Sequence, residues 1–393
     1  MSSMRRVLGI ICEYNPFHNG HAYQLQTARE VTRADVVVCV MSGPFTQRGD
    51  AALFSPRLRA QMALSSGADV VVELPSSYAL REAEFFALGG VSILNALGVT
   101  HISFGCENEE LTTLQKAALL LEKPSSGFQS ALRLGLNQGM SHAKAQGEAL
   151  SSHVDGLHRG IISSPNNVLA ICYLRAIHRI GSTMIPVPVK RMGAYHDTNW
   201  KEGFASATAV REALRRGDFS FVEKAIPNKA LPLLLHAMEH GLYHRPECLD
   251  LLLRDRLRTM THDDLRRYPN VSEGLEHRVA SMAPNHTSRR SLLEELKTKR
   301  YTYTRLNRLL THILLDMTVE KLNNCTPSSF RLLGFKASAR PYLSSLPEGL
   351  LYTKAARQQK DESFRLDMVA YDLWALGASL PLGEGYRQQV AII

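Results

Sequence analysis

The sequence contains no apolar stretch of about 20 residues, the length that a helix needs to cross a bilayer. Its N-terminal apolar run is too short for a secretory signal peptide and reaches Glu13 and Asn15 where small residues would be required. Hydrophobic residues make up 45% of the chain and charged residues 21%, which is typical of a folded globular protein. We therefore expect a soluble, cytoplasmic protein that does not bind a membrane.

Closely spaced cysteines are also absent. The six cysteines lie far apart and form no Cys-x-x-Cys pair, which argues against a disulfide framework and against a zinc site. We assign no metal ligands and expect most of these cysteines to be buried apolar residues. They are Cys12, Cys39, Cys106, Cys172, Cys248 and Cys325.

Acidic residues are fewer than basic ones, and the formal net charge of +9 favours an acidic partner such as nucleic acid. The basic excess is concentrated between Arg289 and Arg308, where seven arginines and lysines stand against two glutamates. Tyr301 and Tyr303 are interleaved with these cations, so one of them could stack on an unpaired base. The alternative is a solvated basic helix face with two tyrosines in the core.

Short apolar runs alternate with helical patterns over the first two hundred residues. Continuous apolar runs of this kind are buried on both faces of a parallel sheet, so we predict an α/β fold with a doubly wound parallel sheet. Ligands of such sheets bind at the carboxyl ends of the strands. The predicted strands lie within 5–14, 34–43, 68–75, 99–107 and 183–190, and the predicted helices near 20–33, 55–66, 82–96, 109–121 and 166–180.

After about residue 215 the pattern becomes helical, with apolar residues at helical spacing in 231–243, 251–260, 291–299 and 306–317. Single cores usually stop growing at roughly 250–300 residues, so a chain of 393 residues favours two domains. We predict one domain over 1–215 and a second, mainly α-helical domain over 216–393.

The stretch "EYNPFHNGHAY" places two histidines where a predicted strand runs into a helix. A helix N-terminus offers unpaired N–H groups and the positive end of the helix dipole, which suit a phosphate. His18 and His21 would add imidazole donors, and Gly20 would let a phosphate approach the backbone. The alternative is an ordinary helix start, capped by Asn19, with two solvated histidines.

A second helix start, "FASATAVREAL", places Ser206, Thr208 and Arg211 together. Hydroxyls, free amides and a guanidinium at one helix terminus suit a polyphosphate. Taken alone, this stretch is more readily explained as an ordinary N-cap before an amphipathic helix.

These strings resemble a known family. "HNGH" and "SATAVR" are similar to the two signatures of the H-x-G-H nucleotidyltransferases, and "EYNPFHNGH", "MSGPFTQRGD", "GADVVVELP" and "YTYTRLNRLLTHILL" resemble the bacterial tRNA(Met) cytidine acetate ligases. The resemblance implies a catalytic domain with a sheet of nucleotidyltransferase (HUP) type and a helical tRNA-binding domain. It also implies that ATP activates acetate as acetyl-adenylate, and that the acetyl group passes to the N4 amine of the wobble cytidine of elongator tRNA(Met).

The resemblance also implies site residues. His18 and His21 would be catalytic, and ATP would be the co-substrate, normally accompanied by Mg²⁺. ATP-binding residues would be Leu8, Gly9, Ile10, Ile11, Cys12, Glu13, Tyr14, Asn15, Pro16, Phe17, His18, Asn19, Gly20, His21, Gly105, Asn166, Arg191, Ser206, Thr208 and Arg211. Candidate tRNA-binding residues are Lys297, Lys299, Arg300, Arg305 and Arg308.

Some of these residues have an alternative role. Gly105 could be a turn residue and Asn166 a helix cap. Gln47, Arg48 and Asp50 could shape the substrate pocket or simply form a hydrogen-bonded loop. Two other functions also stay open, namely a nucleotidyltransferase that adenylates a small phosphorylated metabolite, and a non-catalytic RNA-binding protein with a vestigial nucleotide pocket.

Overall fold

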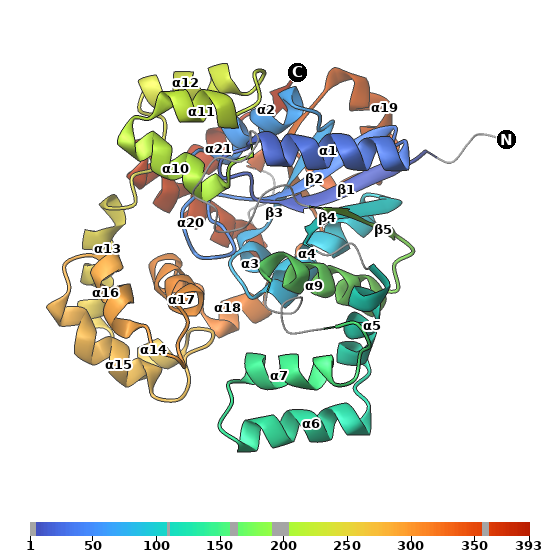
Figure 1. Ribbon diagram of the computed structural model, residues 1–393. Helices are drawn as coiled ribbons and strands as arrows, with labels where there is room; N and C mark the ends of the chain where they lie inside the picture. The colour runs from blue at the N-terminus through green and yellow to red at the C-terminus, as the bar shows by residue number, and fades with distance from the viewer. Residues whose placement is uncertain (1–4, 108–110, 158–163, 191–203, 356–360) are drawn as a thin grey trace.

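The structure is a computed structural model that describes residues 5–107, 111–157, 164–190, 204–355 and 361–393 (Figure 1). An eight-stranded, mostly parallel sheet forms its centre. The strand order is β5-β4-β1-β2-β3-β6-β7, and β8 pairs with β6. The α/β fold predicted from the sequence is confirmed.

The first five strands lie within the five predicted apolar runs. All five are parallel, and β1 to β4 are largely buried, as their continuous apolar sequences indicate. The edge strand β5 is only partly buried, and its Ile185 is exposed. Their bounds are β1 Val7–Cys12, β2 Val36–Ser42, β3 Val70–Leu74, β4 His101–Cys106 and β5 Ile185–Lys190.

The helices between these strands also follow the prediction. They are α1 Asn19–Thr32, α2 Pro56–Ser65, α4 Ala83–Ala96, α5 Leu111–Glu122 and α9 Pro165–Arg179. Among the described residues between these strands, three further helices were not predicted: α3 Ser76–Ala79, and the pair α6 Ser126–Asn137 and α7 His142–Ser151. Figure 1 shows α6 and α7 side by side, projecting from the main body.

Each face of the sheet has its own hydrophobic core. Leu8 and Ile10 of β1 pack with α1 and α2, while Val7 packs with α4, α5 and α9. A Cβ on Gly9 would lie 2.7 Å from the Leu94 side chain of α4. Gly9 therefore permits the close packing of α4 on β1.

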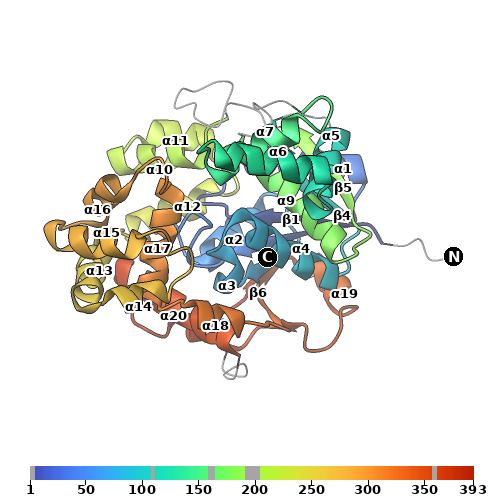
Figure 2. The same ribbon diagram turned by 90° about the horizontal axis from the view of Figure 1, so that it is seen from below.

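The four helical patterns of the second half are confirmed as α12, α13, α16 and α17. Buried leucines such as Leu253, Leu293 and Leu310 join α13, α16 and α17 in a third core. Seen from below, α13 to α16 form a group on the opposite side from α5 (Figure 2). The bounds are α10 Ala207–Arg216, α11 Phe219–Ala225, α12 Leu231–Glu239, α13 Cys248–Thr259, α14 His262–Arg266, α15 Leu275–Met282, η1 Ala283–Asn285, α16 Arg289–Leu296, α17 Tyr303–Leu315 and α18 Val319–Asn323.

The C-terminal segment differs from the helical expectation, because it returns to the central sheet. Strand β6 pairs antiparallel with β3, so the sheet is not wholly parallel. Local sequence could not indicate this, since the partner of Leu332 is Val72, far away in the chain. The elements are β6 Phe330–Phe335, η2 Ala337–Ala339, α19 Arg340–Leu343, β7 Leu351–Tyr352, α20 Glu362–Gly377, α21 Glu384–Arg387 and β8 Ala391–Ile392.

The division at residue 215 stays a prediction, but α11 and α12 belong to a sheet-facing core. Val222 and Leu234 from these helices pack with α1 and α2. The group formed by α13 to α17 instead meets the sheet through the loop after β2. Gly49 of this loop has a φ of +90°, and a Cβ there would lie 2.7 Å from the backbone nitrogen of Arg308 in α17.

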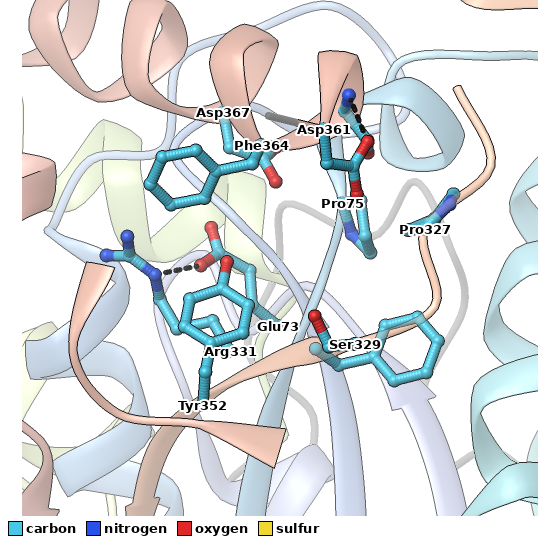
Figure 3. Close-up of a pocket in the computed structure, with 11 residues that line it drawn as sticks. Glu73, Pro75, Pro327, Ser329, Arg331, Tyr352, Asp361, Phe364 and Asp367 are labelled. Atoms are coloured by element: carbon cyan, nitrogen blue, oxygen red, sulfur yellow. Dashed lines mark hydrogen bonds and ion pairs between the residues drawn. The ribbon is translucent and has the colours of Figure 1, made fainter. Parts of the chain in front are cut away.

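A buried ion pair joins β6 to the carboxyl end of β3 (Figure 3). Arg331 Nε lies 3.4 Å from Glu73 Oε2, and the Tyr371 hydroxyl donates to the same oxygen at 3.1 Å. Burial raises the pKa of Glu73, and the Arg331 charge opposes this rise. A small cavity beside the pair is also lined by Tyr352 and Asp367.

We predict that Arg331→Met lowers the free energy of unfolding by about 3–5 kcal/mol, because it leaves a buried carboxylate without its cation. The Glu73 pKa should then rise further above its unfolded value, so stability should fall as the pH rises. Urea unfolding at pH 6 and pH 8 measures both effects. The double variant Glu73→Gln with Arg331→Met should lose less free energy of unfolding than Arg331→Met alone. If Arg331→Met lost the same amount at pH 6 and pH 8, this account would be contradicted.

Candidate active site

The predicted ATP-binding segments meet where the strand order reverses. β1 lies between β2 and β4, so the chain leaves β1 toward one edge of the sheet and later reaches β4 on the other side. A crevice at the carboxyl ends of two such strands is the usual ligand site of an open α/β sheet. The predicted residues 8–21 begin inside β1 and continue past its end at Cys12, and Gly105 is the next-to-last residue of β4.

Part of the segment 8–21 is structural. The side chains of Leu8, Ile10, Cys12, Tyr14 and Phe17 are buried in the core that faces α1 and α2. Any contact that these residues make with a nucleotide must therefore come mainly from their backbone.

The two histidines form the start of α1 themselves. His18 is the N-cap residue, and its Nδ1 accepts the Gly20 N–H at 3.1 Å. His21 Nδ1 accepts the His18 N–H at 3.3 Å, which completes a reciprocal capping box. A Cβ on Gly20 would lie 3.0 Å from the His18 ring, so glycine lets this ring fold back over the helix start. The alternative of an Asn19 cap is wrong.

Ring packing fixes the orientation of both imidazoles. The His18 and His21 rings stack with centroids 3.7 Å apart, and Tyr14 lies 4.7 Å from His21. His18 is only 4% exposed. Because each Nδ1 accepts a backbone N–H, a neutral ring carries its proton on Nε2. Both histidines are therefore oriented as hydrogen-bond donors through Nε2.

The second motif reaches the first through Arg211. Arg211 Nη1 donates to the backbone oxygen of Asn15 at 2.6 Å, and Nη2 donates to Thr208 Oγ1 at 3.2 Å. Ser206 is the N-cap of α10, where its Oγ accepts the Ala209 N–H at 3.1 Å. Ser206 is therefore an N-cap residue, as the alternative interpretation expected. Arg211 in addition joins the start of α10 to the segment before α1.

Two charged residues lie near the end of β1. Arg59 was not identified from the sequence, and Glu13 was assigned only as part of the ATP-binding segment. Arg59, fully buried in α2, donates to the backbone oxygens of Glu13 at 2.6 Å, Phe54 at 3.1 Å and Gly43. Burial lowers its pKa to about 10, so Arg59 remains charged at neutral pH. Glu13 Oε1 accepts the Gln47 N–H at 2.6 Å. No local signal marks Arg59, because it lies among the apolar residues of an ordinary helix.

The carboxyl end of β4 brings Gly105 and Asn166 to the same edge. Gly105 is a strand residue paired with Val189, not a turn. Asn166 lies in the first turn of α9, whose N-cap is Ser164, and its Nδ2 donates to Glu107 Oε1 at 3.1 Å. Arg191 lies outside the described residues.

The loop 43–53 after β2 is held by hydrogen bonds to α17. Asn307 Nδ2 donates to the Arg48 backbone oxygen at 2.9 Å and to Asp50 Oδ1 at 2.8 Å. Thr311 Oγ1 donates to the Gly49 oxygen at 2.6 Å. The charge of Asp50 also acts on Arg211 and on Tyr303. This loop therefore lies between the H-x-G-H region and the start of α17.

The candidate tRNA-binding residues have different surroundings. Lys297, Lys299 and Arg300 are exposed at the end of α16 and beyond. Arg305 Nη2 donates hydrogen bonds to the Asn270 backbone oxygen at 2.6 Å and to Ser272 Oγ at 3.0 Å. Arg308 is only 8% exposed and lies 3.8 Å from Glu82.

The two tyrosines of this segment also differ. Tyr301 is buried and donates to the Glu273 oxygen at 2.7 Å, whereas Tyr303 is 44% exposed. Tyr301 is thus a core residue, as the alternative interpretation expected. Arg308 is likewise unsuited to contact a phosphate at the surface.

The described residues contain neither a candidate metal site nor a membrane-spanning helix. No group of three or more histidine, cysteine, aspartate or glutamate residues among them could hold a metal ion. None of the described helices is long and apolar enough to span a bilayer. Four cysteines are buried, Cys325 is partly exposed and Cys248 is exposed, and none of the six forms a disulfide in this structure.

A mostly parallel sheet with an H-x-G-H helix start at the point of strand-order reversal defines a nucleotidyltransferase-like protein. The family model described as HIGH Nucleotidyl Transferase matches residues 4–387. A relative from Bacillus velezensis, named tRNA(Met) cytidine acetate ligase, is 36% identical over 97% of this chain and 94% of its own. A protein of the same name from Caldicellulosiruptor saccharolyticus is 40% identical over 88% of this chain and 86% of its own.

A solved structure is similar over almost the whole chain. It is Thermotoga maritima TmcAL bound with alpha-thio ATP, with a TM-score of 0.90, 30% identity and coverage of 98% of this chain and 99% of that chain. The apo form of the same protein gives a TM-score of 0.91. The chain therefore belongs to the HIGH nucleotidyl transferase family and, within it, to the tRNA(Met) cytidine acetate ligases.

We predict that His18→Ala lowers the free energy of unfolding by about 1 kcal/mol, because the N-cap of α1 is lost. His18→Asn should lose less than about 0.5 kcal/mol, since asparagine is a favourable N-cap residue. Urea unfolding of both variants separates capping from ring packing. An equal loss in both would mean that the stacked imidazole, rather than the cap, supplies the stability.

Proposed function

We propose that this protein uses ATP to activate acetate as acetyl-adenylate, with release of pyrophosphate. It then transfers the acetyl group to the N4 amine of the wobble cytidine of elongator tRNA(Met). The observation that carries this proposal is the Arg211 to Asn15 hydrogen bond of 2.6 Å, which unites the two predicted phosphate-binding helix starts at one strand end. The names of the relatives and the nucleotide bound to the Thermotoga protein support it.

The activation step needs alignment and charge stabilisation rather than a base. Acetate is already ionised at neutral pH and can attack the α-phosphate directly. Negative charge then grows on the phosphate oxygens, where preorganised donors are most effective. His18 and His21 supply Nε2–H donors here, and the N-termini of α1 and α10 supply backbone N–H groups.

ATP would be held by the backbone of residues 8–21 and by Gly105, Asn166, Ser206, Thr208 and Arg211, with Arg191 as a further expected contact. Mg²⁺ would accompany the phosphates. It dehydrates reluctantly and usually keeps several waters, so phosphate and water ligands would suffice for it.

Transfer to tRNA would use the α16–α17 surface. Lys297, Lys299 and Arg300 are the exposed cations that could contact phosphates. Tyr303 could stack on the target base, because it is exposed and lies near Asp50, whose charge also acts on Arg211. The base would then lie close to the adenylate. We place this reaction in the cytoplasm, where tRNA is available.

Pyrophosphate exchange tests this function against its alternatives. Carboxylate activation should give exchange of labelled pyrophosphate into ATP that depends on acetate, whereas adenylation of a phosphorylated metabolite or simple RNA binding should not. Mass spectrometry of nucleosides should find labelled N4-acetylcytidine after incubation with ATP, labelled acetate and tRNA(Met). Acetyl-CoA without ATP should give none, and product under that condition would refute the adenylate mechanism.

We predict that His21→Ala lowers acetate-dependent exchange by about 10²-fold or more, because it removes a donor aimed at the developing charge. His18→Asn should cause a similar loss although it keeps the helix cap. Exchange rates and unfolding curves of the same preparations separate activity from stability. Unchanged exchange would leave both histidines as helix caps only.

We predict that replacing Lys297, Lys299 and Arg300 together by Glu weakens tRNA binding and flattens its salt dependence by about one released counterion per lost phosphate contact. Binding titrations at several salt concentrations measure this. Acetate-dependent exchange should persist, since it needs only the nucleotide site. Lys116→Glu, an exposed charge reversal on α5, is the matched control. If the triple variant binds tRNA normally, tRNA docks elsewhere.

A further inference from the structure

Glu13 occupies a position that the activation step does not explain. It follows β1 directly, and Tyr173 of α9 is near enough for the Glu13 charge to act on its hydroxyl. Side chains of β1 alternate between the two faces, and Val7 and Ile11 pack toward α4, α5 and α9. Glu13 is the next residue of that alternation, so its side chain lies on the α9 side of the sheet, near Tyr173 and beyond the end of β1.

Only one oxygen of this carboxylate is held by the protein. Oε1 accepts the Gln47 N–H at 2.6 Å, and none of the described residues donates a hydrogen bond to Oε2. Oε2 is not among the buried polar atoms that lack a partner, and the side chain is partly exposed. Oε2 therefore remains accessible to a bound molecule.

The surroundings of Glu13 suit a base. Packing against protein atoms raises its pKa above the ordinary value of 4.5. The Gln47 N–H and the charges of Arg48, Arg59 and Arg211 oppose this rise. These cations also offset the repulsion between a carboxylate and the anions of the activation step. A raised pKa makes a carboxylate a stronger proton acceptor.

The transfer step needs such an acceptor. The lone pair of the cytosine N4 amine is delocalised into the ring, so the nitrogen becomes strongly acidic once it attacks a carbonyl. We propose that Oε2 of Glu13 accepts the N4 proton during acetyl transfer, an inference that rests on the proposed function. The N4–carbonyl bond forms, the bond from the carbonyl carbon to the phosphate oxygen breaks, its electron pair leaves with AMP, and the proton passes to Glu13.

Neighbouring groups are less suited to this role. His18 and His21 use Nδ1 to accept backbone N–H groups, so their Nε2 atoms are donors. Asp50 is exposed, and its Oδ1 already accepts from Asn307 at 2.8 Å. Asp50 is the nearest rival, and the test includes it.

The test separates the two half-reactions. Glu13→Gln should lower acetyl transfer from supplied acetyl-adenylate to tRNA(Met) by about 10²-fold or more. Acetate-dependent pyrophosphate exchange should fall much less than transfer, because Glu13→Gln keeps the backbone groups of residues 8–21 that would hold ATP, and the tRNA-binding surface on α16 and α17 is unchanged. Glu13→Asp should restore part of the transfer rate. Glu122→Gln, which changes another partly buried glutamate bonded to Arg175, is the control and should leave both half-reactions intact.

The pH dependence of the transfer rate distinguishes a base from a residue that is only structural. The transfer rate of the original protein should fall as the pH drops through the Glu13 pKa, and Glu13→Asp should move this fall to lower pH. Equal losses of exchange and transfer in Glu13→Gln, or no loss of transfer, would overturn the proposal. So would a selective transfer loss in Asp50→Asn but not in Glu13→Gln. If the original protein makes no N4-acetylcytidine, the proposed function itself fails.

Discussion

The buried Arg59 guanidinium is the interaction on which the arrangement of the site depends. It donates to the backbone oxygens of Glu13, Gly43 and Phe54, which belong to the segments after β1, after β2 and before α2. Carbonyl oxygens at strand ends have no ladder partner, so a buried cation that satisfies three of them removes a large desolvation cost. The charge also fixes where the chain leaves two neighbouring strands.

The second constraint is the contact between the loop 43–53 and α17. Gly49 approaches the α17 backbone more closely than any side chain would permit, and Asn307 and Thr311 bond the loop oxygens. Arg289 reinforces this contact, since its Nη2 lies 3.1 Å from the Gly49 oxygen and 2.5 Å from Thr311 Oγ1. The helical part is therefore joined by these hydrogen bonds to a loop that also borders the proposed nucleotide site. Activation and transfer can thus use adjacent surfaces.

Many of the candidate site residues could be found from the sequence, but their roles could not be separated. His18 and Ser206 act as helix caps whatever else they do, and Arg211 joins two segments. Capping and phosphate binding use the same residue types because both satisfy backbone N–H groups. Among the basic residues, burial separates Arg308 from Arg300. Charge counts carry no information about burial, so both arginines were predicted from the sequence to bind tRNA.

The sequence by itself determined the parallel strands, their helices and the two helix starts. These features depend on local patterns: β-branched runs, helical spacing of apolar residues, and the short H-x-G-H motif. Tertiary structure decided the return of β6 to the sheet, the Glu73–Arg331 pair, the bonds from Arg59 to Glu13 and Gly43, and the placement of Glu13 near Tyr173. Each of these joins residues that are distant in the chain, and hydrogen bonding or burial at such positions is set by the packed fold, which local sequence patterns do not encode.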